Sequence, residues 1–390
     1  MRKVAVYGCG MNQFGMYEGG LVQMMAEVSL AAMDDAGVDK VDAVFVGNMG
    51  GGILNHQTGI ASALVDCLSL YPAAAMLIEN GPASGGAAVS AAFMAVASGL
   101  YDTVLVTGGE KMRTVSPWEV TDFVATLTHP EAEYIYGITL PALAGMFTRL
   151  YMEKYGVTAE HLAKVAIKNH LHALHNPYAH VQLAPVMEAI LGSEDALVVN
   201  PYVADPLRFY DLCPVSDGAA ALILSSSEVG NFKKPPVFIK GIGHATDTHT
   251  VHERKDPTDL AAVRLAAEKA YKMAGLGPKD VMVAELHDPF TILEIAESEE
   301  VGFFPKGEGH LALERGDTSL GGSTPINPSG GLKAKGHPVG ATGVAQICEL
   351  VWQLRGEAGK RQVKDAKVGL AVNLGGFGNN VVVTILAREE

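Results

Sequence analysis

Residues 236–243 read Pro-Val-Phe-Ile-Lys-Gly-Ile-Gly, and residues 3–8 read Lys-Val-Ala-Val-Tyr-Gly. Both stretches have the apolar run of a β-strand and end in glycine. Behind each, apolar residues at three- and four-residue spacing predict a helix, over Gly20–Ala36 and Asp259–Ala274, which a glycine ends. The next expected strands are Ala43–Val46 and Val281–Leu286. The pattern recurs after about 230 residues, so we expect an internal duplication.

The two copies also match in a third element. Ile78–Pro82 leads into an Ala/Gly-rich helix that runs to Gly99, and Ser323–Asn327 leads into a glycine-rich loop and a helix from about Thr342 to Leu354. The remaining expected strands are Thr103–Gly108, Ala219–Ser225, Val368–Asn373 and Asn380–Leu386. Strands that alternate with helices predict an α/β fold with parallel or mixed sheets covered by helices. Two copies predict two similar layers with functional sites between them.

The duplication divides the chain into an N-terminal half, residues 1–235, and a C-terminal half, residues 236–390. The N-terminal half carries a long insertion at about residues 113–206, which is rich in Tyr, His and Pro. One helix is expected in it, around Ala159–Leu174. Long insertions usually serve as functional caps or subunit contacts.

Composition excludes several classes of protein. Of the 390 residues, 48% are apolar, which excludes a disordered chain. The chain has 29 Lys+Arg and 43 Asp+Glu, and the resulting net charge of −14 disfavours binding to nucleic acid or anionic membranes. Four scattered cysteines (Cys9, Cys67, Cys213 and Cys348) form no disulfide framework and no CxxC metal site. They fit a reducing compartment, so we expect a cytoplasmic protein.

A membrane span and a secretory signal are not expected. The uncharged stretch Asn80–Tyr101 is long enough to cross a bilayer, but its glycines, serines and proline favour a loop followed by a fully buried helix. The N-terminus is basic, yet its apolar run is short and is interrupted by Gly8 and Gly10.

The most specific segment is Asn327–Gly343, Asn-Pro-Ser-Gly-Gly-Leu-Lys-Ala-Lys-Gly-His-Pro-Val-Gly-Ala-Thr-Gly. Its five glycines allow close approach of the backbone to a ligand, and the helix that follows favours negative charge at its N-terminus. His337 lies between Gly336 and Pro338 on a rigid loop that can orient its imidazole.

Three further segments follow expected strands. His287, in His-Asp-Pro-Phe, comes directly after a strand, where α/β sheets gather functional groups. Glu79–Gly86 is a strand-loop-helix elbow, and Ser84 is its only hydroxyl; it lacks the GxSxG pattern, so we expect a helix-start role rather than a nucleophile. Asn373–Gly378, Asn-Leu-Gly-Gly-Phe-Gly, offers backbone amides for an oxyanion.

A cluster of metal-capable side chains has no zinc-like spacing, so no metal is expected. Its members are His244, Asp247, His249, His252 and Glu253.

The chain resembles the thiolase superfamily, most of all the sterol-carrier-protein-type thiolases and the archaeal acetyl-CoA acetyltransferases. The resemblance covers essentially the whole chain and rests on ASGLYDTVLVTGGEKM at 97–112, CPVSDGAAALIL at 213–224 and GGLKAKGHPVGATGVAQ at 330–346. It implies a duplicated five-layer αβαβα thiolase fold with two mixed sheets, an inserted loop domain and a dimer.

The resemblance also implies which positions carry the chemistry. The family's nucleophilic cysteine falls on Pro82, and the acid/base cysteine of its HDCF motif falls on Pro289, so both thiols are replaced. His337 and His287 match the family's two oxyanion-site histidines, and Gly375 matches the glycine of a second oxyanion site. Proline has no backbone N–H, so Pro82 removes a thiol and an amide donor together. The residues expected to bind the oxyanion or substrate are Ser84, Gly340, Asn373, Gly375 and Gly376.

Three functions remain open. In the first, the enzyme cleaves or forms a C–C bond in a 3-oxoacyl-CoA without an acyl-cysteine. Free CoA attacks directly in a ternary complex, and one histidine takes the thiol proton near its natural pKa. An aromatic or branched substrate such as benzoylsuccinyl-CoA would suit this route. The second is a retro-aldolase acting on a 3-hydroxyacyl-CoA, and the third is a non-catalytic acyl-CoA-binding scaffold. Another cysteine, such as Cys67, Cys213 or Cys348, is not expected to replace the nucleophile, because core packing explains each.

The expected ligands are acyl-CoA and CoA, with CoA as a substrate and no bound cofactor. The resemblance implies a homodimeric core and a small zinc-ribbon/OB-fold partner subunit. No nucleic-acid or membrane partner is expected.

Overall fold

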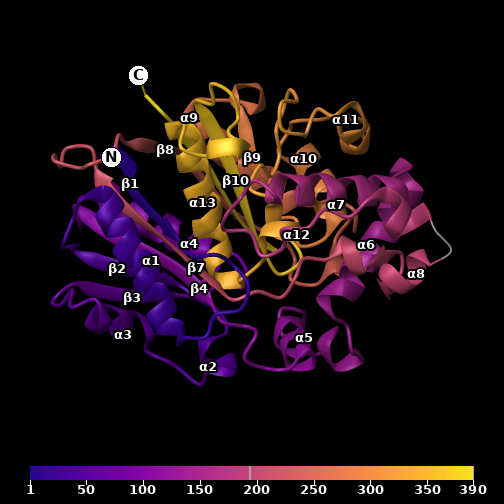
Figure 1. Cartoon of the computed structure of the whole chain (residues 1–390), viewed down its shortest axis with the longest axis horizontal. Helices are drawn as coiled ribbons and strands as arrows, with labels where there is room; N and C mark the ends of the chain where they lie inside the picture. Colours follow the sequence, from indigo (N-terminus) through magenta and orange to yellow (C-terminus); the bar gives the residue numbers. More distant parts are fainter. Residues whose placement is uncertain (193–194, 390) are drawn as a thin grey trace.

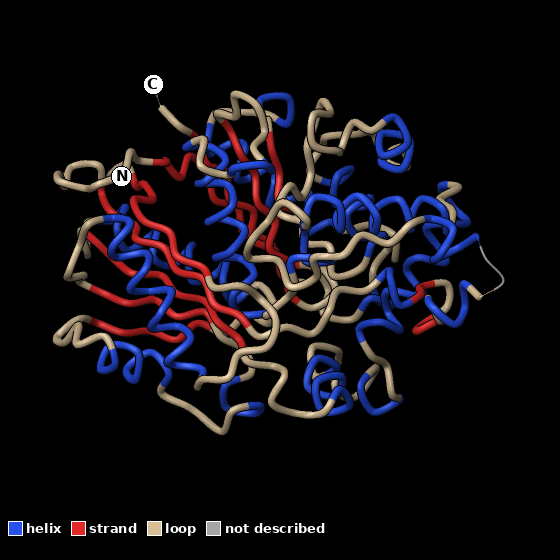
Figure 2. Tube along the Cα trace, viewed as in Figure 1, coloured by secondary structure: helices blue, strands red, loops and turns tan. Residues whose placement is uncertain are grey.

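The computed structural model describes residues 1–192 and 195–389. Nine strands form one mixed sheet in the order β3-β2-β4-β7-β1-β8-β11-β10-β9. The strands are β1 (Val4–Met11), β2 (Ala43–Gly47), β3 (Ala74–Ile78), β4 (Thr103–Glu110), β7 (Gly218–Ser226), β8 (Val237–Thr246), β9 (Val283–Glu285), β10 (Val368–Gly375) and β11 (Asn380–Ala387). Figure 2 shows them as two groups, with helices around both.

The duplication predicted from the sequence is confirmed by the order of the strands. Counted outward from the centre, β1, β7, β4 and β2 of one half correspond to β8, β11, β10 and β9 of the other. In both halves the first two pairings are antiparallel and the third is parallel. The two expected sheets are joined where the duplicated first strands pair antiparallel, through Ala5↔Phe238 and Val6↔Val237.

The copies differ at their outer edges. β3 is a full strand that pairs parallel with β2, whereas the expected counterpart Ser323–Asn327 contributes a single bridge, Ala284↔Ile326.

The prediction that the first strands end at their glycines is wrong, because β1 continues past Gly8 to Met11 and β8 past Gly243 to Thr246. A Cβ on Gly8 would collide with the carbonyl of Ala32, and one on Gly243 with that of Ala266. These glycines therefore let a helix pack directly on each strand.

Five layers of structure confirm the predicted fold class. α1 (Leu21–Ala36) and α3 (Ile60–Cys67) pack on the outer face of the N-terminal strands. α9 (Ala261–Ala274) and α10 (Thr291–Glu300) pack on the outer face of the C-terminal strands. Between the two groups of strands lie α4 (Ser84–Ser98) and α13 (Val339–Arg355), as Figure 1 shows.

Within the uncharged stretch Asn80–Tyr101, residues Ser84–Ser98 form the central helix α4, as predicted. The expectation that this helix is buried on all sides is wrong, because Met94 is 60% exposed. Within the described residues, no helix combines the length and apolar character that a membrane crossing needs.

The insertion forms the group of magenta helices at the right of Figure 1. It includes α5 (Pro117–Ala125), η1 (Tyr134–Tyr136), α6 (Leu140–Tyr155), α7 (Ala159–Ala173), η2 (Glu188–Gly192), α8 (Ala196–Val199) and β5 (Tyr202–Ala204), which pairs with β6 (Leu207–Arg208). The predicted helix around Ala159–Leu174 is confirmed as α7. Leu143 and Phe147 of α6 join the same core as Leu293 of α10. The insertion therefore covers the C-terminal half of the sheet.

The remaining short elements are α2 (Gly51–Leu54), η3 (Phe209–Asp211), η4 (Val251–Glu253), η5 (Pro278–Asp280), α11 (Gly309–Arg315), α12 (Gly331–Lys335) and η6 (Gly359–Arg361).

Candidate active site

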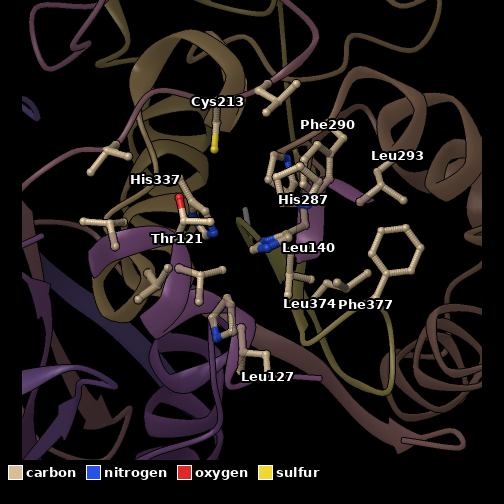
Figure 3. Close-up of a pocket in the computed structure, with 18 of the residues that line it drawn as sticks. Thr121, Leu127, Leu140, Cys213, His287, Phe290, Leu293, His337, Leu374 and Phe377 are labelled. Atoms are coloured by element: carbon tan, nitrogen blue, oxygen red, sulfur yellow. The ribbon is translucent and has the colours of Figure 1, made fainter. Parts of the chain in front are cut away.

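Four segments that are distant in the sequence surround one cavity of about 250 Å³. They are the elbow before α4, the loop after β9, the glycine-rich loop before α13 and the turn after β10. The lining is mostly apolar, with contributions from α5, α6 and α10, as the close-up in Figure 3 shows. Among the described residues that line it, none is Lys, Arg, Asp or Glu.

Pro82 and Pro289 both face this cavity. Pro82 is buried in the elbow two residues before α4, and its carbonyl accepts a hydrogen bond from Nδ2 of Asn373 at 3.1 Å. Pro289 follows β9, and its carbonyl accepts a hydrogen bond from the N–H of Cys213 at 2.8 Å. The two positions at which the sequence analysis expected thiols therefore line the same cavity.

His287 and His337 face each other across this cavity. Their ring centroids are 4.9 Å apart and their planes are nearly perpendicular, at 86°. Both rings line the cavity, and both residues are more than nine-tenths buried. Within the part of the chain that is described, neither Nε2 atom has a hydrogen-bond partner. Two unpartnered imidazole nitrogens are therefore available to one ligand atom.

Asn373 sets the tautomer of His287. Its Oδ1 accepts from the N–H of Gly86 at 2.8 Å, so Nδ2 must face the other side of the amide. There Nδ2 lies 3.4 Å from Nδ1 of His287 and donates to it. Nδ1 is then an acceptor, and the ring proton is on Nε2, which becomes a donor toward the cavity.

Thr342 determines the tautomer of His337. Its Oγ1 lies 2.7 Å from Nδ1 of His337 and 3.1 Å from the carbonyl oxygen of Pro338. When the hydroxyl proton points at Nδ1, Nε2–H is a donor; when it points at Pro338, Nδ1 donates to the hydroxyl and Nε2 accepts. A rotation of one hydroxyl thus exchanges the two states.

Both imidazoles are held neutral. Burial, and then the neighbouring His337, lowers the pKa of His287 well below its usual value. Burial, and then Lys335, lowers the pKa of His337 to about 3. The expectation that one histidine titrates near its natural pKa is therefore wrong, because the cationic form is desolvated in this cavity. Neutral hydrogen-bond donation to an oxyanion suits the pair better than proton storage does.

Buried carboxylates hold the loop of His287. Its backbone N–H donates to Oε2 of Glu297 at 2.8 Å. The next residue, Asp288, accepts from the N–H of Leu332 and from Nδ2 of Asn169, each at 2.7 Å. These bonds connect the loop after β9 with α7 of the insertion and with α12 of the glycine-rich segment, which fixes the direction of the ring.

A second cavity adjoins this one at the end of β10. Gly376 lines both spaces, with φ of +56°, and Gly375 lines the second one, of about 560 Å³. Leu127 completes the wall between them. The second cavity is more polar and includes Asn379 and Asn380.

Of the five residues expected to bind the oxyanion or substrate, only Gly376 lines this cavity. Gly375 lines the second cavity, and Asn373 contacts His287 from outside the lining.

Ser84 and Gly340 have other roles. Oγ of Ser84 donates to the carbonyl of Gly81 at 2.5 Å and accepts from the N–H of Asn80 at 2.8 Å. Its hydroxyl is therefore used within the elbow, which agrees with the predicted role at the start of the helix. Gly340 is a packing residue, because a Cβ there would lie 2.7 Å from the carbonyl oxygens of Gly47 and Gly109. Neither residue lines the cavity.

The metal-capable histidines do not converge. His244 Nε2 lies 2.6 Å from Oδ1 of Asn380, and His249 Nδ1 lies 2.9 Å from Nδ2 of Asn379. Nδ1 of His252 lies 3.7 Å from Oε1 of Glu133. Each ring thus has a separate protein partner.

Sequence reasoning missed Cys213 as a site residue. Core packing was the expected role, yet the side chain lines the cavity beside both histidines and is partly exposed. Its position at the start of CPVSDGAAALIL was the available signal. The pairing that brings this segment against the loop after β9, Leu212↔Phe290, is not visible in the sequence.

Comparison with known proteins gives a consistent result. Residues 4–228 match the profile of the thiolase N-terminal domain, and residues 243–388 match that of the thiolase C-terminal domain-like family. The acetyl-CoA acetyltransferase of Methanothermobacter thermautotrophicus is 43% identical over 392 residues, which cover 100% of both chains. Human sterol carrier protein 2 is 35% identical, over 99% of this chain and 72% of the human protein.

Solved structures show the same architecture. The Ltp2-ChsH2(DUF35) aldolase superposes with a TM-score of 0.82 at 26% identity, over 99% of this chain and 98% of that one. Human mitochondrial 3-ketoacyl-CoA thiolase superposes with a TM-score of 0.72, over 100% of this chain and 99% of that one; at 18% identity this likeness concerns the fold alone.

Proposed function

Because this chain belongs to the thiolase family and is an acyltransferase of that superfamily, we propose that it cleaves or forms a C–C bond in a 3-oxoacyl-CoA without an acyl-cysteine. Free CoA attacks the 3-oxo carbon directly, in a ternary complex. The observation that carries the proposal is the pair of neutral, buried imidazoles with unpartnered Nε2 atoms in a cavity lined by Pro82 and Pro289.

Pro82 and Pro289 support a route without an acyl-enzyme. In the proposed mechanism Pro82 takes the family's nucleophile position and Pro289 its acid/base position, so neither can bind an acyl group or move a proton. The remaining chemistry is the stabilisation of negative charge. When C2–C3 breaks, the electron pair passes into the thioester as an enolate, and His287 and His337 donate Nε2–H hydrogen bonds to its oxygen.

The cavity supports an apolar acyl group. Phe290, Phe377, Leu293 and Leu140 contribute to its lining, together with five valines. An aromatic or branched acyl group would bury its surface there. The carboxylate of a benzoylsuccinyl group would find no Lys or Arg among the described lining residues, so an uncharged acyl group is the better fit.

The test uses benzoylacetyl-CoA, an uncharged aromatic 3-oxoacyl-CoA, with the purified protein. Products are followed by mass spectrometry with free CoA present or absent. We expect benzoyl-CoA and acetyl-CoA only when free CoA is present, and no acyl adduct on the protein. Cleavage without free CoA, or an acylated cysteine in wild type, would contradict direct thiolysis.

A retro-aldolase acting on a 3-hydroxyacyl-CoA is the second candidate. It is favoured by the likeness to the Ltp2-ChsH2(DUF35) aldolase, which exceeds 25% identity over nearly the whole chain. The same enolate site would serve both reactions. The corresponding 3-hydroxyacyl-CoA, supplied in the same assay, distinguishes them: release of an aldehyde without free CoA identifies the aldolase.

Tight acyl-CoA binding with no turnover of either substrate would leave the non-catalytic scaffold. The assay is repeated with the small zinc-ribbon/OB-fold subunit that we propose as a partner, because the aldolase neighbour is named as a complex with a second protein.

Exposed apolar side chains in the insertion and just after it are the contacts that we propose for that partner. Trp118 is 82% exposed, Phe209 59% and Tyr202 50%. Val203 and Val215 are also exposed and line the cavity, so this surface adjoins its mouth. A subunit bound there would cover the substrate.

The proposed homodimer uses the edge strand β3. This strand ends the sheet, and Met76 and Leu77 on it are 43% and 44% exposed. Met94 on the adjacent α4 is 60% exposed. Unprotected apolar edge strands pair readily with a second copy, and this one carries no charge between Ala74 and Ile78.

A further inference from the structure

Cys213 is hydrogen-bonded through its backbone to the segment that carries Pro289. It follows η3 and precedes β7, and its N–H donates to the carbonyl of Pro289 at 2.8 Å. The residue before it, Leu212, forms an antiparallel bridge with Phe290. Two consecutive contacts thus hold the thiol beside the position where the related enzymes are expected to carry their acid/base cysteine.

The thiol points into the cavity of the two histidines. Figure 3 shows the sulfur of Cys213 directed toward the space between His337 and His287, and all three residues line the cavity. Cys213 is a free cysteine, and its side chain is partly exposed. The other cysteines lie elsewhere: Cys348 is buried with its thiol directed at backbone carbonyls, and Cys67 is exposed on α3.

The charge of a buried lysine acts on this thiol. Lys333 of α12 is 4% exposed, and its Nζ lies 3.1 Å from Nε2 of His170 and 5.7 Å from the ring centre of Tyr210. Burial raises the pKa of the Cys213 thiol to about 12, and the charge of Lys333 acts in the opposite direction. The thiol is therefore a proton donor at neutral pH, and its conjugate thiolate has a compensating charge nearby.

Independently of the cysteine, the cavity is built for a developing oxyanion. The Nε2 atom of His287, on a residue 1% exposed, faces it without a protein partner. An enolate held by that nitrogen has its second carbon within the same small space, where a proton must be delivered for the reaction to finish. Pro289 supplies no proton, and neither do the apolar side chains.

We propose that Cys213 is the catalytic acid that protonates C2 of the enolate, and the base that removes this proton in the reverse direction. This inference rests on the proposed function, because it needs an acyl-CoA enolate at His287 and His337. It assigns to Cys213 the proton transfer that Pro289 cannot perform.

The transfer balances over one turnover. The CoA thiolate attacks C3, C2–C3 breaks, and its electron pair forms the enolate. The S–H bond of Cys213 then breaks as a C–H bond forms at C2, which leaves a thiolate beside Lys333. That thiolate takes the proton of the next CoA thiol, which becomes the attacking thiolate. One proton thus passes from CoA to C2, and no oxidant or reductant is required.

The test measures hydrogen exchange at C2, which needs no C–C cleavage. Acetyl-CoA is incubated with the whole protein in D₂O, and deuterium at C2 is followed by mass spectrometry. We expect exchange by wild type, and a loss of at least about 100-fold in Cys213→Ala, as for removal of a general acid/base. Cys67→Ala, an equal change on an exposed cysteine outside the cavity, should exchange at the wild-type rate.

Two controls separate a chemical loss from misfolding. Acetyl-CoA should bind Cys213→Ala with little change in Kd, and Cys213→Ser should recover part of the exchange because a hydroxyl keeps a weak donor in place.

The outcomes are distinguishable. Exchange by Cys213→Ala at the wild-type rate, together with its loss in His337→Ala, overturns the role of Cys213 and leaves the proposed function intact. No exchange by wild type that binds acetyl-CoA overturns both, because no enolate is then formed. Loss of exchange in Cys213→Ala with intact binding supports both.

Discussion

The rings of His287 and His337 stand nearly perpendicular, with centroids 4.9 Å apart, although the two residues come from different loops of the C-terminal half. This arrangement brings two unpartnered Nε2 atoms into one cavity. Because both rings are neutral, each can donate one hydrogen bond to the same oxygen without mutual charge repulsion.

Removing either imidazole should slow turnover and leave binding nearly intact. We expect His337→Ala and His287→Ala each to lower kcat by about 100- to 1000-fold, the usual loss for one oxyanion donor, with a small change in KM. Steady-state kinetics with benzoylacetyl-CoA check this. His175→Ala, on an exposed histidine after α7, is the matched control. If kcat fell and KM rose to the same extent in all three variants, the effect would be a general structural one.

Asn373→Asp should reverse the tautomer of His287. A carboxylate accepts hydrogen bonds and cannot donate to Nδ1, so the ring proton moves to Nδ1 and Nε2 loses its donor. The Gly86 N–H bond to Oδ1, at 2.8 Å, is kept. We expect kcat to fall by about 100-fold or more, and ¹⁵N NMR of the histidine ring to show the change of tautomer. The same substitution at Asn231, on an exposed loop, should have no effect, and full activity of Asn373→Asp would refute this role.

His172 should stabilise the fold only where it is neutral. Its ring connects α7 to Asn327 and Leu320, at 2.9 and 3.2 Å. Burial, and then Lys168, lowers its pKa from 6.5 to about 3. In the unfolded chain it takes up a proton below pH 6.5, so its stabilising effect is complete above that pH and is lost as the pH falls toward 3.

The comparison of wild type with His172→Gln isolates this effect from other titrating groups. The difference in the free energy of unfolding should shrink by about 2 kcal/mol between pH 7 and pH 5. Urea unfolding at both pH values measures it. A difference that is constant with pH would show that this histidine does not titrate as proposed.

Leu127→Trp should narrow the acyl site selectively. Leu127 lies in the wall shared by the two cavities, so an indole there takes up space that a bulky acyl group needs. We expect kcat/KM for benzoylacetyl-CoA to fall by about 10-fold or more, in the range of steric discrimination in apolar pockets, with a smaller fall for acetoacetyl-CoA. Leu100→Trp, at a residue 67% exposed, is the control. Equal losses for both substrates would argue against an acyl group in this cavity.

A charge on the edge strand should prevent dimer formation. Leu77→Lys places an ammonium on β3, and a lysine on an edge strand opposes pairing with a second copy. Light scattering after size-exclusion chromatography should show a dimer for wild type and a monomer for this variant. Leu183→Lys, on an exposed loop residue of the insertion, should remain dimeric. If it dissociates as well, the contact lies elsewhere.

Much of the fold follows from local pattern. The helices Gly20–Ala36 and Asp259–Ala274 were predicted within two residues of α1 and α9, because an apolar stripe and a terminal glycine mark a helix without reference to the rest of the chain. The role of Gly8 and Gly243 was mistaken for the same reason. Their purpose is the close approach of a helix from another part of the chain, and a local pattern contains no such information.

The site was predicted in part. The resemblance pointed to His287, His337 and Pro82, and these three residues line one cavity. Gly375, which it matched to a second oxyanion site, lines the neighbouring cavity instead. Cys213 was missed because its proximity to the histidines depends on the bridge between Leu212 and Phe290, which are 78 positions apart by their numbering.

The sequence by itself determined the duplicated αβ order, the family and the presence of proline at positions 82 and 289, since these depend on residue identity and spacing along the chain. The tertiary structure alone decided how the remaining groups behave. It made both imidazoles neutral by removing them from water, it fixed the tautomer of His287 through an asparagine from β10, and it directed the Cys213 thiol at the same space. Protonation and orientation depend on dielectric and on neighbours in space, and these exist only after the chain has folded.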